Sequence, residues 1–286
     1  MQNNLVGATS SQAAGVRQPQ GASAGQLDPR AHERRVIAAY NSKSRLSFNP
    51  TEKSRYLNIG FWRGGASSLD EAAEAMARLV SQAGDLGRND YILDVGCGFG
   101  DADIFWSAAC QSTRFVGIDI NPDDINIARA RAADAGLGDR IEFRVASAVQ
   151  LPFADEVFDK VVAMESAHHF LTREKFFQES FRVLKPGGRL VLADLVPLLG
   201  ARFQPFFNPH NKYPKEVYAQ KLYSAGYFKV KLTSIRDDVF VPYAKFIRSR
   251  LPFWDVKSHF NVALQRIVSG GLDYILAVAE KPPATS

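Results

Sequence analysis

From Tyr91 onward, segments with the hydrophobic pattern of strands alternate with segments that have the periodicity of helices. Short runs rich in β-branched residues alternate with stretches of helical period, a pattern typical of a parallel sheet covered by helices. The pattern predicts strands at 91–95, 114–120, 140–146, 160–165 and 188–195. It predicts helices that begin near Asp101, Pro122 and Thr172. The sequence therefore indicates an α/β fold with a doubly wound sheet.

Further elements are predicted on both sides of this region. The segment "SLDEAAEAMARLVSQAG" combines apolar periodicity with a Ser68-to-Glu71 capping box and a terminal Gly84, so it predicts a helix that packs on the sheet. Residues 197–218 contain "FQPFFNPHNKYP" and predict a long loop over a cleft. Beyond this loop the pattern predicts a helix in "KEVYAQKLYSAGY", a strand in "FKVKLTSI", a helical region over 243–268 and a closing strand in "LDYILAVAE".

The composition and charge of the chain argue against several classes of protein. Residues 1–30 are rich in Gln, Ala, Ser and Gly and have no apolar stretch long enough for a signal peptide or membrane span, so we expect a disordered leader. The net charge of +5 is spread along the chain without a basic, aromatic stripe, which argues against a nucleic acid partner. Cys97 and Cys110 form neither a disulfide framework nor a zinc site, which fits a reducing cytoplasm. No metal cluster of suitable spacing appears, and we expect metal independence.

The segment "LDVGCGFGDAD" at 93–103 places three glycines at every second position between the first strand and the first helix. Such a turn brings backbone N–H groups to a ligand at the carboxyl ends of the strands. A dinucleotide fingerprint requires a small residue where this chain has Asp101, so nicotinamide or flavin binding is disfavoured. Asp119 ends the second strand about 20 residues after the loop, where a carboxylate binds ribose hydroxyls.

Four segments in order, "LDVGCGFG", "VGIDINPDDINIARARA", "LPFADEVFDKVVAMESAHHF" and "FRVLKPGGRLVLADL", resemble the motifs of class I S-adenosylmethionine-dependent methyltransferases. The resemblance implies a seven-stranded Rossmann-like sheet with an antiparallel last strand and S-adenosyl-L-methionine as the cofactor. By motif match it assigns the methionine moiety to Asp94, Gly96 and Gly98, the ribose to Asp119, and one face of the adenine to Ile120.

The chain departs from this family at Ser147, which is followed by Ala148. Many relatives have at this position an aspartate that accepts a hydrogen bond from the adenine amino group. A hydroxyl accepts this bond more weakly than a carboxylate, so we expect Ser147 and Ala148 to contact the cofactor with lower affinity. Upstream, "RVIAAYN" and "RYLNIGFW" resemble an N-terminal lid over 31–90, with Tyr40 and Trp62 against the cofactor. The alternative that both aromatic residues only pack an N-terminal helix remains open.

The segment "ESAHHF" places Glu165, His168 and His169 just beyond the fourth strand. A sulfonium methyl group is already electrophilic, so the protein mainly aligns the nucleophile, but an alcohol or phenol must also lose its proton. Histidine suits this transfer at neutral pH. Asp194 ends the adjacent strand and can orient His168, a pairing that the resemblance to sugar and natural-product O-methyltransferases supports. His168 is the preferred base, and the alternatives that His169 is the base or that the histidine only packs stay open.

The expected function is methyl transfer to a hydroxyl of a bulky, apolar natural product or its sugar. The expected core covers 91–286, with a phenylalanine-rich insertion at about 198–268 over the substrate. A second hypothesis is carbon methylation of an isoprenoid or lipid alkene, with Glu165 as base, because "VPYAKF" and "SGGLDYILAVAEK" resemble the ends of such enzymes. Arg248, Arg250 and Lys257 could then bind a diphosphate, although a solvated helix face is the favoured interpretation of these charges. A third hypothesis is a non-catalytic scaffold, and the oligomeric state stays open.

Overall fold

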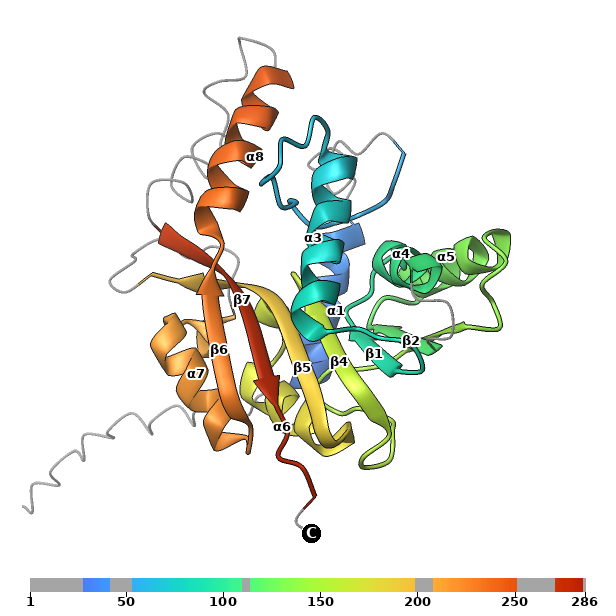
Figure 1. Ribbon diagram of the computed structural model, residues 1–286, viewed down its shortest axis with the longest axis vertical. Coiled ribbons are helices and arrows are strands. Elements are labelled where there is room, and N and C mark those ends of the chain that lie inside the picture. Colours follow the sequence, from blue (N-terminus) through green and yellow to red (C-terminus); the bar gives the residue numbers. More distant parts are fainter. Residues whose placement is uncertain (1–27, 42–52, 110–113, 199–207, 251–270, 285–286) are drawn as a thin grey trace, which may run out of the picture.

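The computed structural model describes residues 28–41, 53–109, 114–198, 208–250 and 271–284. A seven-stranded sheet in the order β3-β2-β1-β4-β5-β7-β6 forms its centre (Figure 1). The strands are β1 Tyr91–Val95, β2 Arg114–Asp119, β3 Ile141–Val145, β4 Phe158–Met164, β5 Leu184–Pro197, β6 Phe228–Ser234 and β7 Leu272–Glu280. Strands β1 to β5 pair in parallel, and β7 lies antiparallel between β5 and β6. The predicted doubly wound sheet with its antiparallel last strand is confirmed.

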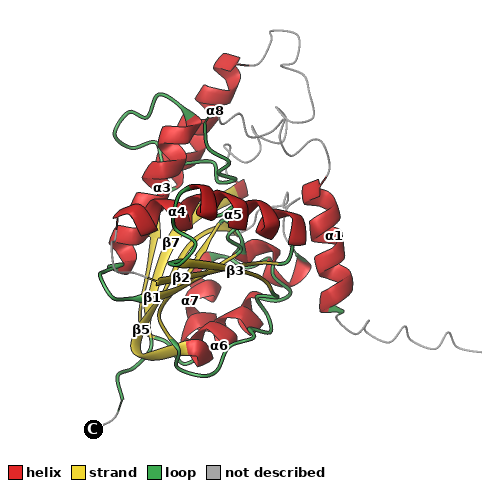
Figure 2. Ribbon diagram, turned by 90° about the vertical axis from the view of Figure 1, so that its right-hand side faces the viewer, coloured by secondary structure: helices red, strands yellow, loops and turns green. Residues whose placement is uncertain are grey.

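Helices cover both faces of the sheet. They are α1 Pro29–Asn41, α3 Leu69–Gly84, α4 Asp101–Ala109, α5 Pro122–Asp134, α6 Arg173–Val183, α7 Lys215–Ser224 and α8 Arg236–Arg250, with 3₁₀ turns at Ala167–His169 and Pro209–Asn211. Figure 2 shows α3, α4 and α5 on one face and α6 and α7 on the other. Helix α1 stands at the edge of this assembly and has no fully buried residue, so polar contacts must hold it in place.

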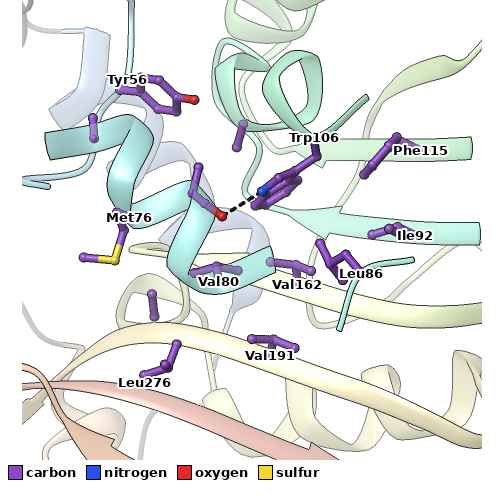
Figure 3. Packing of buried hydrophobic residues seen from close by; sticks show 14 of the residues in the cluster. Tyr56, Met76, Val80, Leu86, Ile92, Trp106, Phe115, Val162, Val191 and Leu276 are labelled. Atoms are coloured by element: carbon purple, nitrogen blue, oxygen red, sulfur yellow. Dashed lines mark hydrogen bonds between the residues drawn. The ribbon is translucent and has the colours of Figure 1, made fainter. Parts of the chain in front are cut away.

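A close-packed core lies between α3, α4 and the sheet. Trp106 is fully buried there and donates from Nε1 to the Ala77 carbonyl oxygen of α3 at 2.8 Å (Figure 3). This bond satisfies the only polar atom of the indole, so the large ring contributes its apolar burial without an unpaired donor. Replacing Trp106 with Ala would cost about 3–5 kcal/mol of folding stability, because the surrounding helices cannot fill the cavity. The core thereby fixes the strand ends that carry the site.

The predicted start of α3 is confirmed, with one difference in its cap. The Ser68 hydroxyl oxygen accepts from the Glu71 backbone N–H at 3.2 Å. The Glu71 carboxylate, however, accepts from the Ser67 backbone N–H at 2.8 Å rather than from the Ser68 N–H of a regular capping box. Both bonds satisfy backbone donors near the start of the helix. The capping-box residues therefore predicted the start of α3 correctly, although Glu71 accepts from Ser67 instead of Ser68.

Two predicted boundaries were wrong. Helix α8 begins at Arg236 rather than at 243, and Pro242 lies inside it. Residues 215–234, within the expected insertion, form the predicted helix and strand as α7 and β6. Helix α1 begins at Pro29, inside the expected leader, where the Asp28 carboxylate accepts from the Ala31 N–H at 3.0 Å. The rest of the leader, residues 199–207 and residues 251–268 lie outside the described residues.

Candidate active site

A cavity lies at the carboxyl ends of β1, β2, β3 and β4, and we call it the site cavity. Its walls come from α1, residues 55–58, the glycine loop 94–99, residues 118–121, residues 146–149 and residues 164–171. Parallel strands bring these segments together, because each strand ends at the same edge of the sheet. Most of the expected site residues meet here: Asp94, Gly96, Gly98, Asp119, Ile120, Ser147, Ala148, Tyr40, Glu165, His168 and His169.

The glycine loop follows β1 with a backbone that other residues adopt only under strain. Gly96 has a φ of 83°, and a Cβ atom there would lie 2.4 Å from the Ser166 Cβ atom. Its N–H donates to the Ile118 carbonyl oxygen at 2.7 Å, which ties the loop to β2. The Gly98 N–H donates to the Asp119 carboxylate at 3.2 Å. Glycine is therefore required for this close approach of the loop to the strand ends.

Asp94 is a buried carboxylate at the start of the loop. Its Oδ1 atom has no hydrogen-bond partner among the described residues, although the side chain is almost fully buried. Burial, with the nearby Asp119 carboxylate, raises the pKa of Asp94 to about 7, and burial also raises the pKa of the neighbouring Asp103. A buried acceptor facing a cavity is suited to a cationic group such as an amino acid ammonium. Asp94 therefore fits the methionine moiety of S-adenosylmethionine.

The adjacent walls fit the adenosyl part of the same molecule. The Asp119 carboxylate lies at the end of β2 and also accepts from the Asn121 N–H at 2.9 Å. Ile120 and Ala148 line the site cavity beyond it. An acidic residue at this place is the usual ribose partner in doubly wound folds, and an apolar side chain suits a purine face. These residues would thus hold the ribose and the base. The glycine loop, which has no side chains at Gly96 and Gly98, would let its own backbone come close to the ligand.

Helix α1 is fastened over the site cavity by polar contacts. A His32 ring nitrogen, Nε2, lies 2.7 Å from the His169 carbonyl oxygen, and the Tyr40 hydroxyl lies 2.6 Å from His169 Nε2. Glu33 contacts the Ser147 hydroxyl, and Asn41 accepts from Asn121 at 2.9 Å. Tyr40 therefore lies at the wall of the site cavity.

Trp62 lies elsewhere, in a correction to the expected lid. It is not among the described residues that line the site cavity. Its ring packs on Phe246 of α8 with centroids 4.9 Å apart, and its Nε1 donates to the Ile59 carbonyl oxygen at 2.9 Å. The apolar partners that α8 offers explain this position, so Trp62 anchors residues 53–67 to α8 and does not line the site cavity.

His168 and Asp194 meet across the ends of β4 and β5. His168 Nδ1 lies 3.1 Å from Asp194 Oδ1, and both side chains are buried. Only His168 of the two lines the site cavity, so Asp194 stands behind the ring. With Asp194 ionised, Nδ1 donates to it, and the neutral imidazole then carries its lone pair on Nε2.

Arg173 completes this arrangement, and sequence reasoning missed it. Its Nε lies 3.0 Å from Asp194 Oδ2, and neither side chain has any exposure to solvent. Burial opposes the charge on Asp194, but the Arg173 guanidinium, the contact with His168 and the Leu195 N–H outweigh it and lower the pKa of Asp194. An arginine in the first turn of a helix is typical of a surface position, so the residue pattern gave no signal of this role.

Asn211 and Tyr218 support the same cluster from beyond β5. The Asn211 amide donates to the His168 and Phe170 carbonyl oxygens at 3.1 and 2.8 Å. The Tyr218 hydroxyl donates to Asp194 Oδ2 at 3.2 Å. The "NPHNKYP" motif pointed to a loop near the cleft, but no pattern showed that its second asparagine would be fully buried.

His169 and Glu165 also line the site cavity. Burial, followed by the nearby charges of His168, His32 and Arg173, lowers the pKa of His169 well below its ordinary value. Burial raises the pKa of Glu165 to about 7, even though its Oε1 accepts from the Tyr274 hydroxyl at 2.7 Å and the Ile59 N–H at 2.9 Å. A neutral imidazole and a carboxyl group poised near pH 7 thus stand close to the His168 and Asp194 pair.

The remaining candidate residues lie away from the site cavity. Arg248 and Arg250 are exposed at the end of α8, where Arg250 stacks over Phe246, and Lys257 and Cys110 lie outside the described residues. Cys97 is a free thiol. Within the described residues, no group of three or more His, Cys, Asp or Glu side chains is arranged to hold a metal ion. No helix in the same ranges is long and apolar enough to cross a membrane.

Comparisons with known proteins identify the family of the chain. Residues 93–192 match the family described as "Methyltransferase domain". The chain is 32% identical over 280 residues to the erythromycin 3''-O-methyltransferase of Saccharopolyspora erythraea. The aligned region covers 85% of this chain and 92% of that protein. The chain is 31% identical over 204 residues to O-methyltransferase resE of Aspergillus sclerotiorum, covering 68% and 76% of the two chains.

A solved structure shares the fold. The crystal structure of geranyl diphosphate C-methyltransferase from Streptomyces coelicolor A3(2) superimposes with a TM-score of 0.72 and covers 87% of this chain and 97% of that chain. Only 16% of the residues are identical, so this likeness concerns the fold and not the substrate.

Proposed function

The chain belongs to the class I S-adenosylmethionine-dependent methyltransferases, and from this premise we propose that it methylates a hydroxyl of a bulky, apolar natural product or its sugar. The observation that carries the proposal is the contact of His168 Nδ1 with Asp194 at 3.1 Å at the wall of the site cavity. A hydroxyl nucleophile needs a base, and this pair has the geometry of one.

The residues around the pair suit the removal of a proton from a bound alcohol. When bound, S-adenosylmethionine supplies an electrophilic methyl group on a sulfonium sulfur. His168 would accept the hydroxyl proton of the acceptor molecule at Nε2, as the hydroxyl oxygen takes up the methyl group that the cofactor would supply. Asp194 holds the ring in the required tautomer and stabilises the imidazolium, and Arg173 keeps Asp194 ionised. Helix α1 covers the site cavity and excludes water.

The relatives support the class of substrate. By its name, the Saccharopolyspora erythraea protein methylates a 3''-oxygen of erythromycin, and the chain matches 92% of the length of that protein. Val36 and Ile37 of α1, with Leu57, Phe170 and Leu171, add apolar side chains to the site cavity. Apolar walls with a few polar groups favour a large, mostly apolar acceptor molecule.

The test is transfer of a ¹³C-labelled methyl group from S-adenosylmethionine into a small-molecule extract of the source organism, with the product located by NMR. We expect label on oxygen, reduced about a hundredfold or more in His168→Ala and in Asp194→Asn. The exposed histidine His210 provides a matched control, and His210→Ala should retain the wild-type rate. Direct binding of S-adenosylhomocysteine to each variant shows that it is folded. Oxygen labelling that persists in His168→Ala would remove His168 as the base.

Glu165 favours a second candidate function. It lines the site cavity, and its pKa of about 7 suits a base that removes a proton from a carbocation formed by alkene methylation. Label on carbon, lost in Glu165→Gln and retained in His168→Ala, would establish carbon methylation instead. An absence of label together with no binding of S-adenosylhomocysteine would leave a non-catalytic scaffold.

A further inference from the structure

We propose that Glu33 of α1 supplies the hydrogen-bond acceptor for the adenine amino group of the cofactor, in place of a carboxylate at position 147. The observation is a direct contact between the Glu33 carboxylate and the Ser147 hydroxyl at the wall of the site cavity. The inference rests on the proposed function only in requiring an adenosyl cofactor. It concerns recognition of the base and is independent of which atom receives the methyl group.

The base end of the site cavity follows from the order of the strands. Asp94 and the glycine loop lie at the end of β1, and Asp119 lies at the end of β2. A ligand whose ribose contacts Asp119 extends toward the next strand in the sheet, which is β3. Residues 146–149 follow β3 and line this end of the site cavity. A purine there lies beside the Ser147 hydroxyl.

The Ser147 hydroxyl alone is a poor acceptor for the amino group. It is already the donor in the contact with Glu33, and it also accepts from the Val149 backbone N–H at 3.3 Å. The Glu33 carboxylate has two oxygens and several lone pairs, so it can accept from Ser147 and from an exocyclic amino group together. An ionised acceptor also binds the amino group more strongly than a neutral hydroxyl does. Ser147 thus positions Glu33, and Glu33 contacts the base.

Contacts that do not involve Glu33 hold α1 in place. His32 and Tyr40 lie on either side of Glu33 in the helix, and both contact His169, as described above. Asn41 contacts Asn121 at the other end of the helix. A change at Glu33 therefore leaves the contacts of His32, Tyr40 and Asn41 in place. The role of Glu33 in recognising the base can then be separated from the position of the helix.

The test compares two ligands whose purines differ at the ring atom N1, which carries a proton only in the inosyl ligand, and in the group at position 6. S-adenosylhomocysteine carries an amino donor there, and S-inosylhomocysteine carries a carbonyl acceptor. Isothermal titration calorimetry of each ligand with the full chain gives a preference ratio, measured for wild type and Glu33→Gln. We expect wild type to prefer the adenosyl ligand and Glu33→Gln to lower this ratio about tenfold or more, because a carboxylate repels the carbonyl and an amide donates to it.

Two further variants control for the position of α1 and for Ser147. Arg35→Gln changes an exposed charge on the same helix and should keep the wild-type ratio. Ser147→Ala removes the group that positions Glu33 and should lower the ratio less than Glu33→Gln does. An unchanged ratio in Glu33→Gln, or an equal loss of affinity for both ligands, would overturn the inference. Failure of wild type to bind either ligand would instead contradict the proposed function, along with any role for Glu33 at the base.

Discussion

The guanidinium of Arg173 lies against the carboxylate of Asp194, with Nε 3.0 Å from Oδ2 and both side chains fully buried. Arg173 also donates to the Asn211 carbonyl oxygen at 2.8 Å and to the Leu195 carbonyl oxygen. Burial opposes its charge, but Asp194 and the nearby tyrosines raise the pKa of Arg173. The pair is therefore ionised, and a fixed negative charge stands behind His168 on the side away from the site cavity.

Loss of the guanidinium should strongly destabilise the protein. Arg173→Met leaves the Asp194 carboxylate buried without its cation, and breaking a buried pair in this way costs about 3–5 kcal/mol. Urea unfolding at pH 7 measures the change. The surface pair of Arg78 with Glu74 is the control, because both side chains are about half exposed, and Arg78→Met should cost less than about 1 kcal/mol. Equal effects of the two substitutions would contradict a special role for Arg173.

The sequence predicted those features that depend on residue patterns within one segment or on strand order. Runs of β-branched residues located the five parallel strands, and the adjacency of β4 and β5 was sufficient to bring His168 toward Asp194. Arg173 and Asn211 could not be predicted, because their burial depends on where the 208–214 segment packs after β5. The contact of Glu33 with Ser147 could not be predicted for a similar reason, because it depends on where α1 packs on the rest of the fold.

Trp62 shows the opposite failure. A motif resemblance placed it at the cofactor, and its local sequence contains nothing that reveals the competing surface of α8. The helix that packs against the ring begins at Arg236, far along the chain, and the sequence pattern placed its start at 243 instead. An aromatic side chain goes where the largest apolar contact is available, which is a property of the assembled fold.

Glu165 should make stability depend on pH. Its pKa is raised from 4.5 to about 7 by burial, so between these values the folded protein holds a proton that the unfolded chain has released. Stability from this group is therefore present below pH 4.5 and is lost as the pH rises toward 7. Glu165→Gln should match wild type at pH 4.5 and exceed its unfolding free energy by about 3 kcal/mol at pH 9.

Urea unfolding of both proteins across pH 4.5 to 9 measures this difference. Glu216→Gln, at an exposed position on α7, is the matched control and should show no comparable trend. A constant difference between Glu165→Gln and wild type at all pH values would mean that Glu165 is not protonated in the folded protein.

Gly96→Ala should weaken both folding and cofactor binding. The new Cβ atom would lie 2.4 Å from the Ser166 Cβ atom at a φ of 83°, so the loop must shift. We expect a loss of about 2 kcal/mol in unfolding free energy and at least about a tenfold loss of affinity for S-adenosylhomocysteine. Gly138→Ala is the control, because a Cβ atom at Gly138 would point into open space, with no side chain to displace. A Gly96→Ala protein with wild-type affinity would show that the loop does not approach the cofactor closely.

Tyr40→Phe should loosen α1 over the site cavity. The substitution removes the hydroxyl that lies 2.6 Å from His169 Nε2, and no residue of α1 is fully buried to compensate. One hydrogen bond contributes about 0.5–1.5 kcal/mol, so S-adenosylhomocysteine should dissociate about three- to tenfold faster. Stopped-flow fluorescence measures the rate, with Tyr223→Phe at an exposed position as the control. Since α1 contributes to the wall rather than to the proton transfer, single-turnover methyl transfer at saturating cofactor should change less than the dissociation rate. If dissociation is unchanged, α1 does not close over the bound cofactor through this contact.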